Sequence, residues 1–104
     1  MKVLWTEAAL SQLEAIYDYI AHTSPDYAAR MMDRLTRRSV QISSLPFSGR
    51  QVPEYQSNEI REVLEWPYRI IYLIQLDQSR IEILAVVHGA RSHPGLSKDR
   101  IDIE

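Results

Sequence analysis

The sequence contains no cysteine, which excludes disulfide bonds, thiolate metal sites and a cysteine nucleophile. It has three glycines, Gly49, Gly89 and Gly95, and they are too far apart to form a glycine-rich phosphate loop. No apolar run approaches the ~20 residues of a membrane span, and the first residues lack the apolar core of a signal peptide. These absences predict a cytoplasmic protein with no membrane partner.

Neither sign of charge dominates, because the 12 Lys and Arg residues nearly balance the 14 Asp and Glu residues, for a net charge of -2. Free-standing nucleic-acid binders are usually basic overall, so this balance argues against direct nucleic-acid binding. The three histidines, His22, His88 and His93, lie in different predicted elements without the spacing of metal ligands. We therefore expect no metal and no other cofactor.

A chain of 104 residues is long enough for one domain with a modest core. Residues 1–104 are expected to form that single domain, because no repeat, low-complexity tract or linker divides them. Residues 92–104 are polar and are expected to be a loose tail.

Two consecutive amphipathic helices are predicted near the amino terminus. The first covers residues 7–22 and follows Thr6, a favourable N-cap. The second covers residues 25–44, with Ser24 as its N-cap and Pro25 in its first turn. Apolar residues recur at helical spacing in both, as Ala9, Leu13, Ile16, Tyr17 and Ile20, and then as Ala28, Met31, Met32, Leu35, Val40 and Ile42. The short connector makes the pair a helical hairpin.

Four strands are predicted around the helical hairpin, at residues 2–5, 59–66, 68–76 and 80–88. The first is expected at an edge of the sheet. Residues 45–53 contain two prolines and Gly49, and are predicted to form an ordered loop. Residues 77–79 are predicted to join the last two strands. This order predicts an α+β domain, with the helical hairpin packed on one face of a small, mainly antiparallel sheet.

Two of the predicted strands are apolar on both faces. Tyr68, Ile70, Tyr72 and Ile74 alternate with Ile71 and Leu73, and Ile81, Ile83, Ala85 and Val87 alternate with Leu84 and Val86. Such strands are normally covered on both faces, and the two helices cover only one. The second face is covered either by residues 46–53 folding back or by another chain, since an uncovered apolar patch usually marks an interaction site.

Few polar residues form a pattern that indicates chemistry. Glu59, Glu62 and Glu65 are expected to face solvent, as are the arginines at positions 30, 34, 37 and 38. Glu62 has a second interpretation, because alternation places it on one face with Ile60 and Leu64. Either a bulge shifts the strand, or the carboxylate meets a semi-buried cation, namely Arg61, Arg69 or Arg91. His88 ends a strand, where a histidine is more often packed than catalytic.

The two tryptophans, Trp5 and Trp66, each end an apolar strand segment. Buried aromatic side chains dominate small cores. We therefore predict that both tryptophans are structural anchors and not ligand platforms.

Several short motifs in a fixed order resemble those of ParE-type toxins. The opening is Trp5-Thr6-Glu7-Ala8-Ala9 with Leu13, Ile16 and Tyr19-Ile20-Ala21, and the connector is Ser24-Pro25 with Ala28-Ala29-Arg30. The middle loop is Leu45-Pro46, Gly49-Arg50 and Val52-Pro53-Glu54, and the closing strands carry Ile60-Arg61-Glu62, Tyr68-Arg69-Ile70-Ile71-Tyr72 and the run from Ile83 to Arg91. From Trp5 to Arg91 the chain thus resembles the RelE/ParE superfamily of type II toxins, on its ParE branch. The resemblance implies two helices packed on a curved antiparallel sheet.

The resemblance also implies a growth-inhibiting toxin that is neutralised by a cognate antitoxin, ParD-like or another short antitoxin. ParE-like members poison DNA gyrase, whereas RelE-like members cut messenger RNA on the ribosome. Arg69 and Arg91 lie where the RelE-like branch carries two catalytic arginines, and Glu62 or His88 would then move protons.

Two departures from the RelE-like pattern favour gyrase poisoning over RNA cleavage. The RelE-like pattern has a basic pair in the preceding strand, but this sequence has Ile60 and Glu62 near those positions. The RelE-like pattern also has a tyrosine in the tail, and the tail after Arg91 has none. A degenerate toxin that only binds its antitoxin is the third possibility. For a gyrase poison we expect no catalytic residues, and the predicted contacts with target or antitoxin are Arg61, Arg69, Ile71, Leu73 and Arg91.

Overall fold

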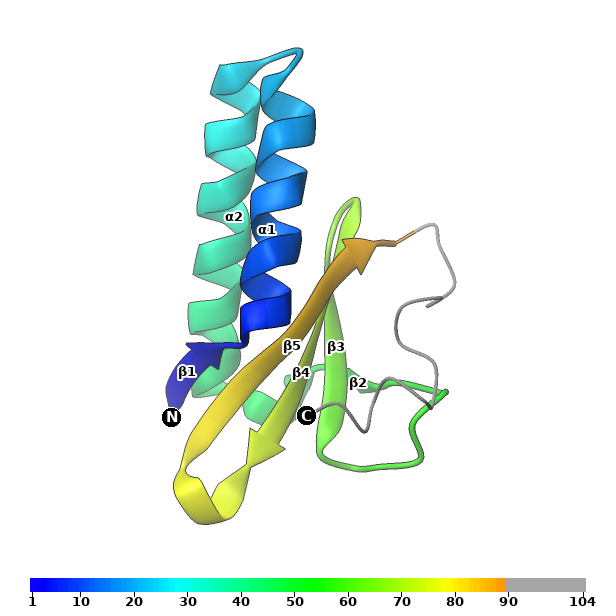
Figure 1. Ribbon diagram of the computed structural model, residues 1–104. Helices are drawn as coiled ribbons and strands as arrows, with labels where there is room; N and C mark the ends of the chain where they lie inside the picture. The colour runs from blue at the N-terminus through cyan, green and yellow to red at the C-terminus, as the bar shows by residue number, and fades with distance from the viewer. Residues whose placement is uncertain (90–104) are drawn as a thin grey trace.

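The computed structural model describes residues 1–89 and confirms the predicted α+β fold. Two helices, α1 (Glu7–Ala21) and α2 (Pro25–Ser44), form the hairpin (Figure 1). The sheet contains β1 (Lys2–Trp5), β2 (Arg50–Gln51), β3 (Ile60–Glu65), β4 (Tyr68–Gln75) and β5 (Arg80–His88). Short 3-10 helices lie at η1 (Pro46–Ser48) and η2 (Leu76–Gln78). Among the described residues, no helix is long and apolar enough to cross a membrane.

Both helices begin where the capping residues predict. The Thr6 hydroxyl accepts a hydrogen bond from Ala9 N at 3.1 Å, and it donates one to Ile83 O at 2.8 Å, so this cap also joins α1 to β5. The Ser24 hydroxyl accepts from Tyr27 N at 3.2 Å, and Pro25 follows in the first turn. The predicted starts of both helices are therefore confirmed.

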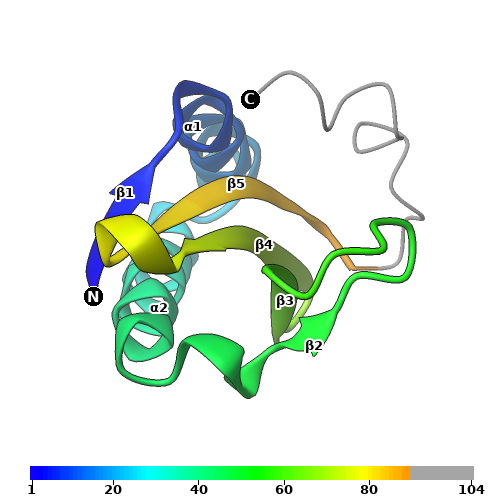
Figure 2. The same cartoon turned by 90° about the horizontal axis from the view of Figure 1, so that it is seen from below.

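The five strands lie in the order β1-β5-β4-β3-β2. The β1 strand runs parallel to β5, and the other neighbouring pairs are antiparallel. Because β1 pairs only with residues 80–83, α1 takes its place along the rest of β5, where Val86 N donates to Gln12 Oε1 at 2.8 Å. Figure 2 shows α1 beside β5, with the sheet separating α2 from the link between β2 and β3.

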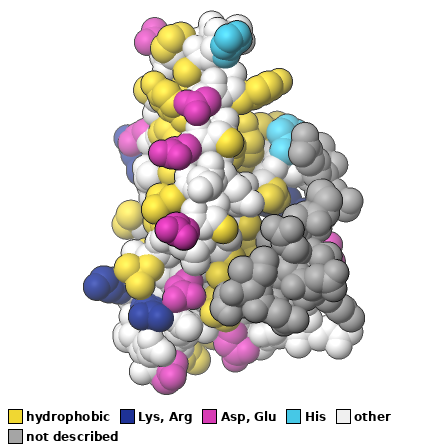
Figure 3. All heavy atoms as spheres, in the orientation of Figure 1, with side chains coloured by type: hydrophobic (Ala, Val, Ile, Leu, Met, Phe, Trp, Pro, Cys, Tyr) yellow, Lys and Arg dark blue, Asp and Glu magenta, His cyan; other side chains and the backbone are white. Residues whose placement is uncertain are grey.

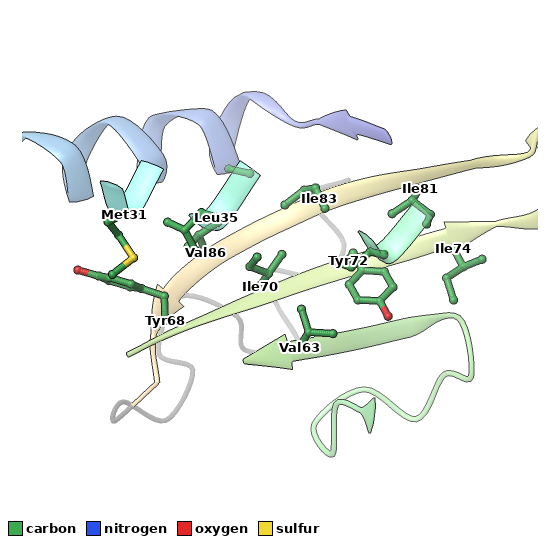
Figure 4. Packing of buried hydrophobic residues seen from close by; sticks show 12 residues of the cluster. Met31, Leu35, Val63, Tyr68, Ile70, Tyr72, Ile74, Ile81, Ile83 and Val86 are labelled. Carbon is green, nitrogen blue, oxygen red and sulfur yellow. The ribbon is translucent and has the colours of Figure 1, made fainter. Parts of the chain in front are cut away.

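The main core fills the space between the helical hairpin and the sheet. Met31 and Leu35 of α2 are fully buried there, together with Ile70 and Tyr72 of β4 (Figure 4). The predicted stripe on α2 is wrong at one position, because Val40 is 64% exposed and the neighbouring Ser39 is buried instead. Ser39 satisfies its buried hydroxyl by donating to Thr36 O at 2.7 Å, which a pattern of apolar residues does not reveal.

The alternation predicted for β5 fails after Ile83. The partner of Tyr72 is Ile83 but the partner of Ile71 is Ala85, so Leu84 is an extra residue in the strand. This bulge exchanges the faces beyond it. Ile81 and Ile83 share one face as predicted, and the helices cover it, but Val86 joins them, and Ala85 and Val87 turn to the second face.

The prediction that both tryptophans are buried anchors is wrong for Trp66. Trp5 is half-buried and packs against the main core, whereas the Trp66 side chain is 67% exposed in the turn between β3 and β4. An aromatic residue that ends an apolar strand can point into the core or into solvent once the strand enters a tight turn.

We expect Trp66→Ala to change the free energy of unfolding by less than about 0.5 kcal/mol, because it removes little buried surface. Trp5→Ala should cost at least about 2 kcal/mol, since it empties a site beside the core. Urea denaturation of the two variants tests this contrast. Equal losses of stability would show that Trp66 packs in solution.

Candidate functional site

The second face of the sheet is covered by this chain's own loop. Val52 and Tyr55 are buried against Ile60 of β3, Ile71 of β4 and Ala85 of β5. Of the two explanations considered for the second face, the folded-back loop therefore accounts for its centre. The cover extends to Tyr55, two residues past the predicted segment. It leaves Leu64 of β3 56% exposed.

Glu62 is a buried carboxylate held between two arginines on this second face. Its side chain is 1% exposed, and it accepts hydrogen bonds from Arg69 Nη2 and from Arg50 Nε. The Arg69 side chain is 9% exposed and the Arg50 side chain 69%, so one cation is buried with Glu62 and the other reaches solvent. Of the two explanations for Glu62, the semi-buried cation is confirmed, with Arg69 as the partner. The expectation that Glu62 faces solvent is wrong.

Arg61 lies on the opposite face and fixes the loop that follows α2. Its guanidinium donates to Asn58 O at 2.8 Å and to Gly49 O at 2.9 Å, and its carbon Cζ lies 5.0 Å from the centre of the Phe47 ring. The guanidinium thus joins Gly49 and Asn58, which are the two ends of the segment that contains β2 and the loop over the second face.

Gly49 allows this loop to approach the sheet closely. A Cβ at this position would lie 2.5 Å from Tyr72 Oη and 2.6 Å from Glu62 O. The Tyr72 hydroxyl accepts from Gly49 N at 3.2 Å and donates to Pro46 O at 2.6 Å. Burial raises the pKa of this phenol above 10.0. The hydrogen bond from Gly49 N lowers the same pKa, but by less.

His88 does not face Glu62 and Arg69. It is the register partner of Tyr68, on the face that the helices cover, and the two rings meet edge to face with their centres 5.7 Å apart. No group of His, Asp and Glu residues that could hold a metal occurs within residues 1–89. The described part of the second face therefore offers a buried ion pair and an exposed guanidinium, without a histidine beside them.

A family model described as the ParE toxin of the type II toxin–antitoxin system parDE matches residues 3–93. The toxin RelE2 of Caulobacter vibrioides is 35% identical over 91 residues, which cover 86% of this chain and 97% of RelE2. Y4kP, a candidate toxin of Sinorhizobium fredii, is 33% identical over 93 residues, which cover 89% of this chain and 93% of Y4kP. The chain belongs to the ParE toxin family. It is a type II toxin of the ParE/RelE group.

Solved structures of toxin–antitoxin systems have the same fold as this toxin. The chromosomal ParDE system of P. aeruginosa contains a chain that is 22% identical, with a TM-score of 0.67, over 85% of this toxin and 95% of that chain. The RelBE2 complex of Mycobacterium tuberculosis contains one that is 20% identical, with a TM-score of 0.61, over 84% of this toxin and 95% of that chain. These likenesses confirm two helices on a small sheet.

The contact residues predicted for the toxin lie in different environments. Ile71 is fully buried beneath the loop and Arg69 is buried in its ion pair, so neither offers accessible surface in this conformation. Leu73 is half-buried and Arg61 is engaged by the loop. Arg91 falls outside the described residues. A contact role for Arg61, Leu73 and Arg91 stays a prediction, whereas contact through Ile71 or Arg69 would require the loop or the ion pair to open.

Two arginine contacts of the toxin were not predicted from sequence. Arg50 was assigned to a loop, but it lies in β2 opposite Glu62. Arg34 of α2 was expected to face solvent. Instead its Nε donates to Glu65 Oε2 at 2.9 Å, and its Nη2 donates to Trp66 O at 2.8 Å. The two residues of β2 are both exposed and carry no apolar pattern that would indicate a strand, and the contact of Arg34 depends on the tertiary fold.

Proposed function

We propose that this toxin inhibits growth by poisoning DNA gyrase and that a cognate antitoxin neutralises it. The family model that matches the chain supports the ParE branch. The relative RelE2, in contrast, carries the name of the other branch. The choice between the two activities therefore rests on the burial and pairing of the arginines on the second sheet face.

The observation that supports gyrase poisoning over RNA cleavage is the burial of Arg69 against Glu62. A nuclease needs guanidinium groups directed at the phosphate in the transition state, and a free base nearby. Here Arg69 is 8% exposed, and the Glu62 carboxylate accepts from Arg69 with one oxygen and from Arg50 with the other. His88 lies on the other face. An ion pair of this kind serves the fold, and a gyrase poison requires no more of it.

Purified toxin tests the proposal in two parallel reactions. With gyrase, ATP and plasmid DNA, we expect cleaved DNA to accumulate. On ribosomes programmed with messenger RNA, we expect no cleavage. Cut messages without cleaved DNA would establish the RNA-cleaving activity instead. Absence of both would mean that binding an antitoxin is the activity that this chain retains.

The proposed antitoxin surface covers α2 and the two long strands of the toxin. An antitoxin segment that is disordered when free would fold as it binds across this surface. The exposed Leu64 and Trp66 add apolar surface beside it, and exposed apolar patches mark interaction sites.

We expect the antitoxin to slow amide hydrogen exchange in residues 25–44 and 68–88, because the bound segment excludes water from them. Hydrogen exchange with and without antitoxin measures this by mass spectrometry. Unchanged exchange in both predicted ranges would place the antitoxin elsewhere.

A further inference from the structure

The end of β3 that leads into the β3–β4 turn is surrounded by four arginines. They are Arg34 and Arg38 of α2, Arg50 of β2 and Arg69 of β4. The two from α2 pair with Glu65, at 2.9 Å and 4.0 Å, and the other two pair with Glu62 on the second face. We call these six residues the arginine corner. Its four cations and two carboxylates give it a net charge of +2.

The positive charge of the arginine corner is separate from the acidic part of the toxin. Helix α1 has no basic residue, and its acidic residues Glu7, Glu14 and Asp18 are all exposed. Figure 3 shows acidic side chains in a row along the helical hairpin. The net charge of -2 is therefore an average over regions of opposite sign. It argues against nucleic-acid binding by the surface as a whole, but it does not describe the arginine corner.

The guanidinium groups of the arginine corner have more donors than their partners accept. Within residues 1–89, two buried side-chain polar atoms have no hydrogen-bond partner, and both lie here, as Arg38 Nε and Arg69 Nε. The distance of 4.0 Å from Arg38 Nε to Glu65 Oε1 is too long for a hydrogen bond. The Arg50 side chain is mostly exposed. The arginine corner therefore has donors left for a further anion.

Two exposed apolar side chains lie within this positive surface. Trp66 is exposed in the turn, where Arg34 Nη2 donates to its carbonyl oxygen at 2.8 Å. Leu64 is exposed on β3, and its register partner is Arg69. An exposed indole beside guanidinium groups combines a flat stacking surface with positive charge. That combination is typical of surfaces that bind single-stranded nucleic acid.

We propose that the arginine corner binds a single strand of DNA, with a base stacked on Trp66 and phosphates paired with the guanidinium groups. Arg34 and Arg38 lie one helical turn apart on α2, and Arg50 reaches solvent from the second face. The choice of DNA over RNA rests on the proposed function, because gyrase poisoning brings the toxin to cleaved DNA. The inference goes beyond that function, since the toxin itself then holds the DNA.

The chemistry of the arginine corner disfavours the other occupants. A second copy of the toxin would bring a second net positive charge against the first. An acidic peptide would pair with the guanidinium groups, but a chain of glutamates has no flat ring to stack on Trp66. Duplex DNA keeps its bases stacked on one another and offers none to the indole.

The test uses a labelled oligodeoxythymidylate of about eight nucleotides and purified toxin, without gyrase. Fluorescence anisotropy at low salt should give a Kd of about 1–100 μM. In isotope-labelled toxin the indole N–H resonance of Trp66 should shift, while that of Trp5 stays in place. A duplex of the same length and a hexaglutamate peptide should each bind at least about tenfold more weakly, because they lose the stacking contact. An RNA strand should bind within about twofold of DNA, since neither contact reads the 2′-hydroxyl group.

Variants separate stacking from charge. Trp66→Ala should weaken binding by about fivefold to 150-fold, the range for loss of one stacked base, whereas Trp66→Phe keeps a ring and should retain most of the affinity. Arg38→Gln/Arg50→Gln should lower the slope of log Kd against log salt concentration by about 1.4, because two phosphate contacts are lost. Arg80→Gln is the control. Arg80 also pairs with a carboxylate, that of Glu82, but it lies beside the other end of β4, so this variant should bind like the wild type.

Several outcomes would overturn the proposal. They are no binding at about 0.1 mM oligonucleotide, an unmoved Trp66 resonance, hexaglutamate bound as tightly as DNA, or RNA preferred by about tenfold or more. A toxin that poisons gyrase but does not bind the strand would refute the arginine corner and leave the proposed function standing. A toxin that binds the strand but does not poison gyrase would refute the proposed function and leave the binding site standing.

Discussion

Glu62→Ala is expected to destabilise the toxin by about 3–5 kcal/mol, because it leaves the Arg69 guanidinium buried without its counter-charge. A domain of this size has a total stability of about 5–15 kcal/mol, so the variant should unfold at a much lower urea concentration. The two oxygens of Glu62 hold Arg69 and Arg50, which makes this carboxylate the most connected buried charge among the described residues.

Arg50→Ala is the matched control for that result. It removes the other partner of the same carboxylate, but the Arg50 side chain is 69% exposed, so the loss should be about 1 kcal/mol or less. Chemical denaturation of both variants gives the comparison. If Glu62→Ala were no less stable than Arg50→Ala, Glu62 would not form the buried pair in solution.

Gly49→Ala should cost about 1–3 kcal/mol through overpacking. The added Cβ would lie 2.5 Å from Tyr72 Oη and 2.6 Å from the Glu62 carbonyl oxygen, and the latter belongs to the backbone and cannot move aside cheaply. Shifting the loop to relieve these contacts would also weaken the hydrogen bond from Gly49 N to Tyr72 Oη. We therefore expect a loss of thermal stability together with easier proteolysis of residues 45–58.

Gly89→Ala makes the same chemical change at a roomier position. Its Cβ would come no closer than 3.0 Å to Pro67 O, so its effect on the melting temperature should be smaller. Neither glycine has a positive φ, so backbone strain does not contribute to the difference. A Gly49→Ala variant as stable as Gly89→Ala would mean that the loop does not lie against Tyr72.

The sequence predicted the regular elements of the toxin because their signals are local. Thr6 and Ser24 cap the two helices, and their side chains form the expected bonds. A nearly continuous apolar run located β4, and both faces of this strand are buried. The bulge at Leu84 could not be predicted, because the position of a bulge depends on the register between neighbouring strands. The apolar pattern of β5 itself does not show it.

The site was predicted only in part, for a related reason. Glu62 is a charge at a position where alternation demands an apolar side chain, so the sequence predicts a cation beside it, and Arg69 is one of the three cations that it offers. Arg50 was missed because a two-residue strand carries almost no periodic signal. The exposure of Trp66 could not be predicted because the burial of a side chain in a turn depends on tertiary contacts, which the local sequence does not show.

The double variant Glu62→Leu/Arg69→Met tests most directly whether Arg69 is structural in a gyrase poison. Replacing both members of a buried pair with apolar residues of similar size keeps such a site packed, so the variant should remain folded. We predict that it still accumulates cleaved DNA with gyrase and ATP at the level of the wild type, and that neither protein cuts messenger RNA on programmed ribosomes. Ribosome-dependent cleavage by the wild type that falls about 100-fold or more in the folded variant would contradict this account, because it would make Arg69 a catalytic residue.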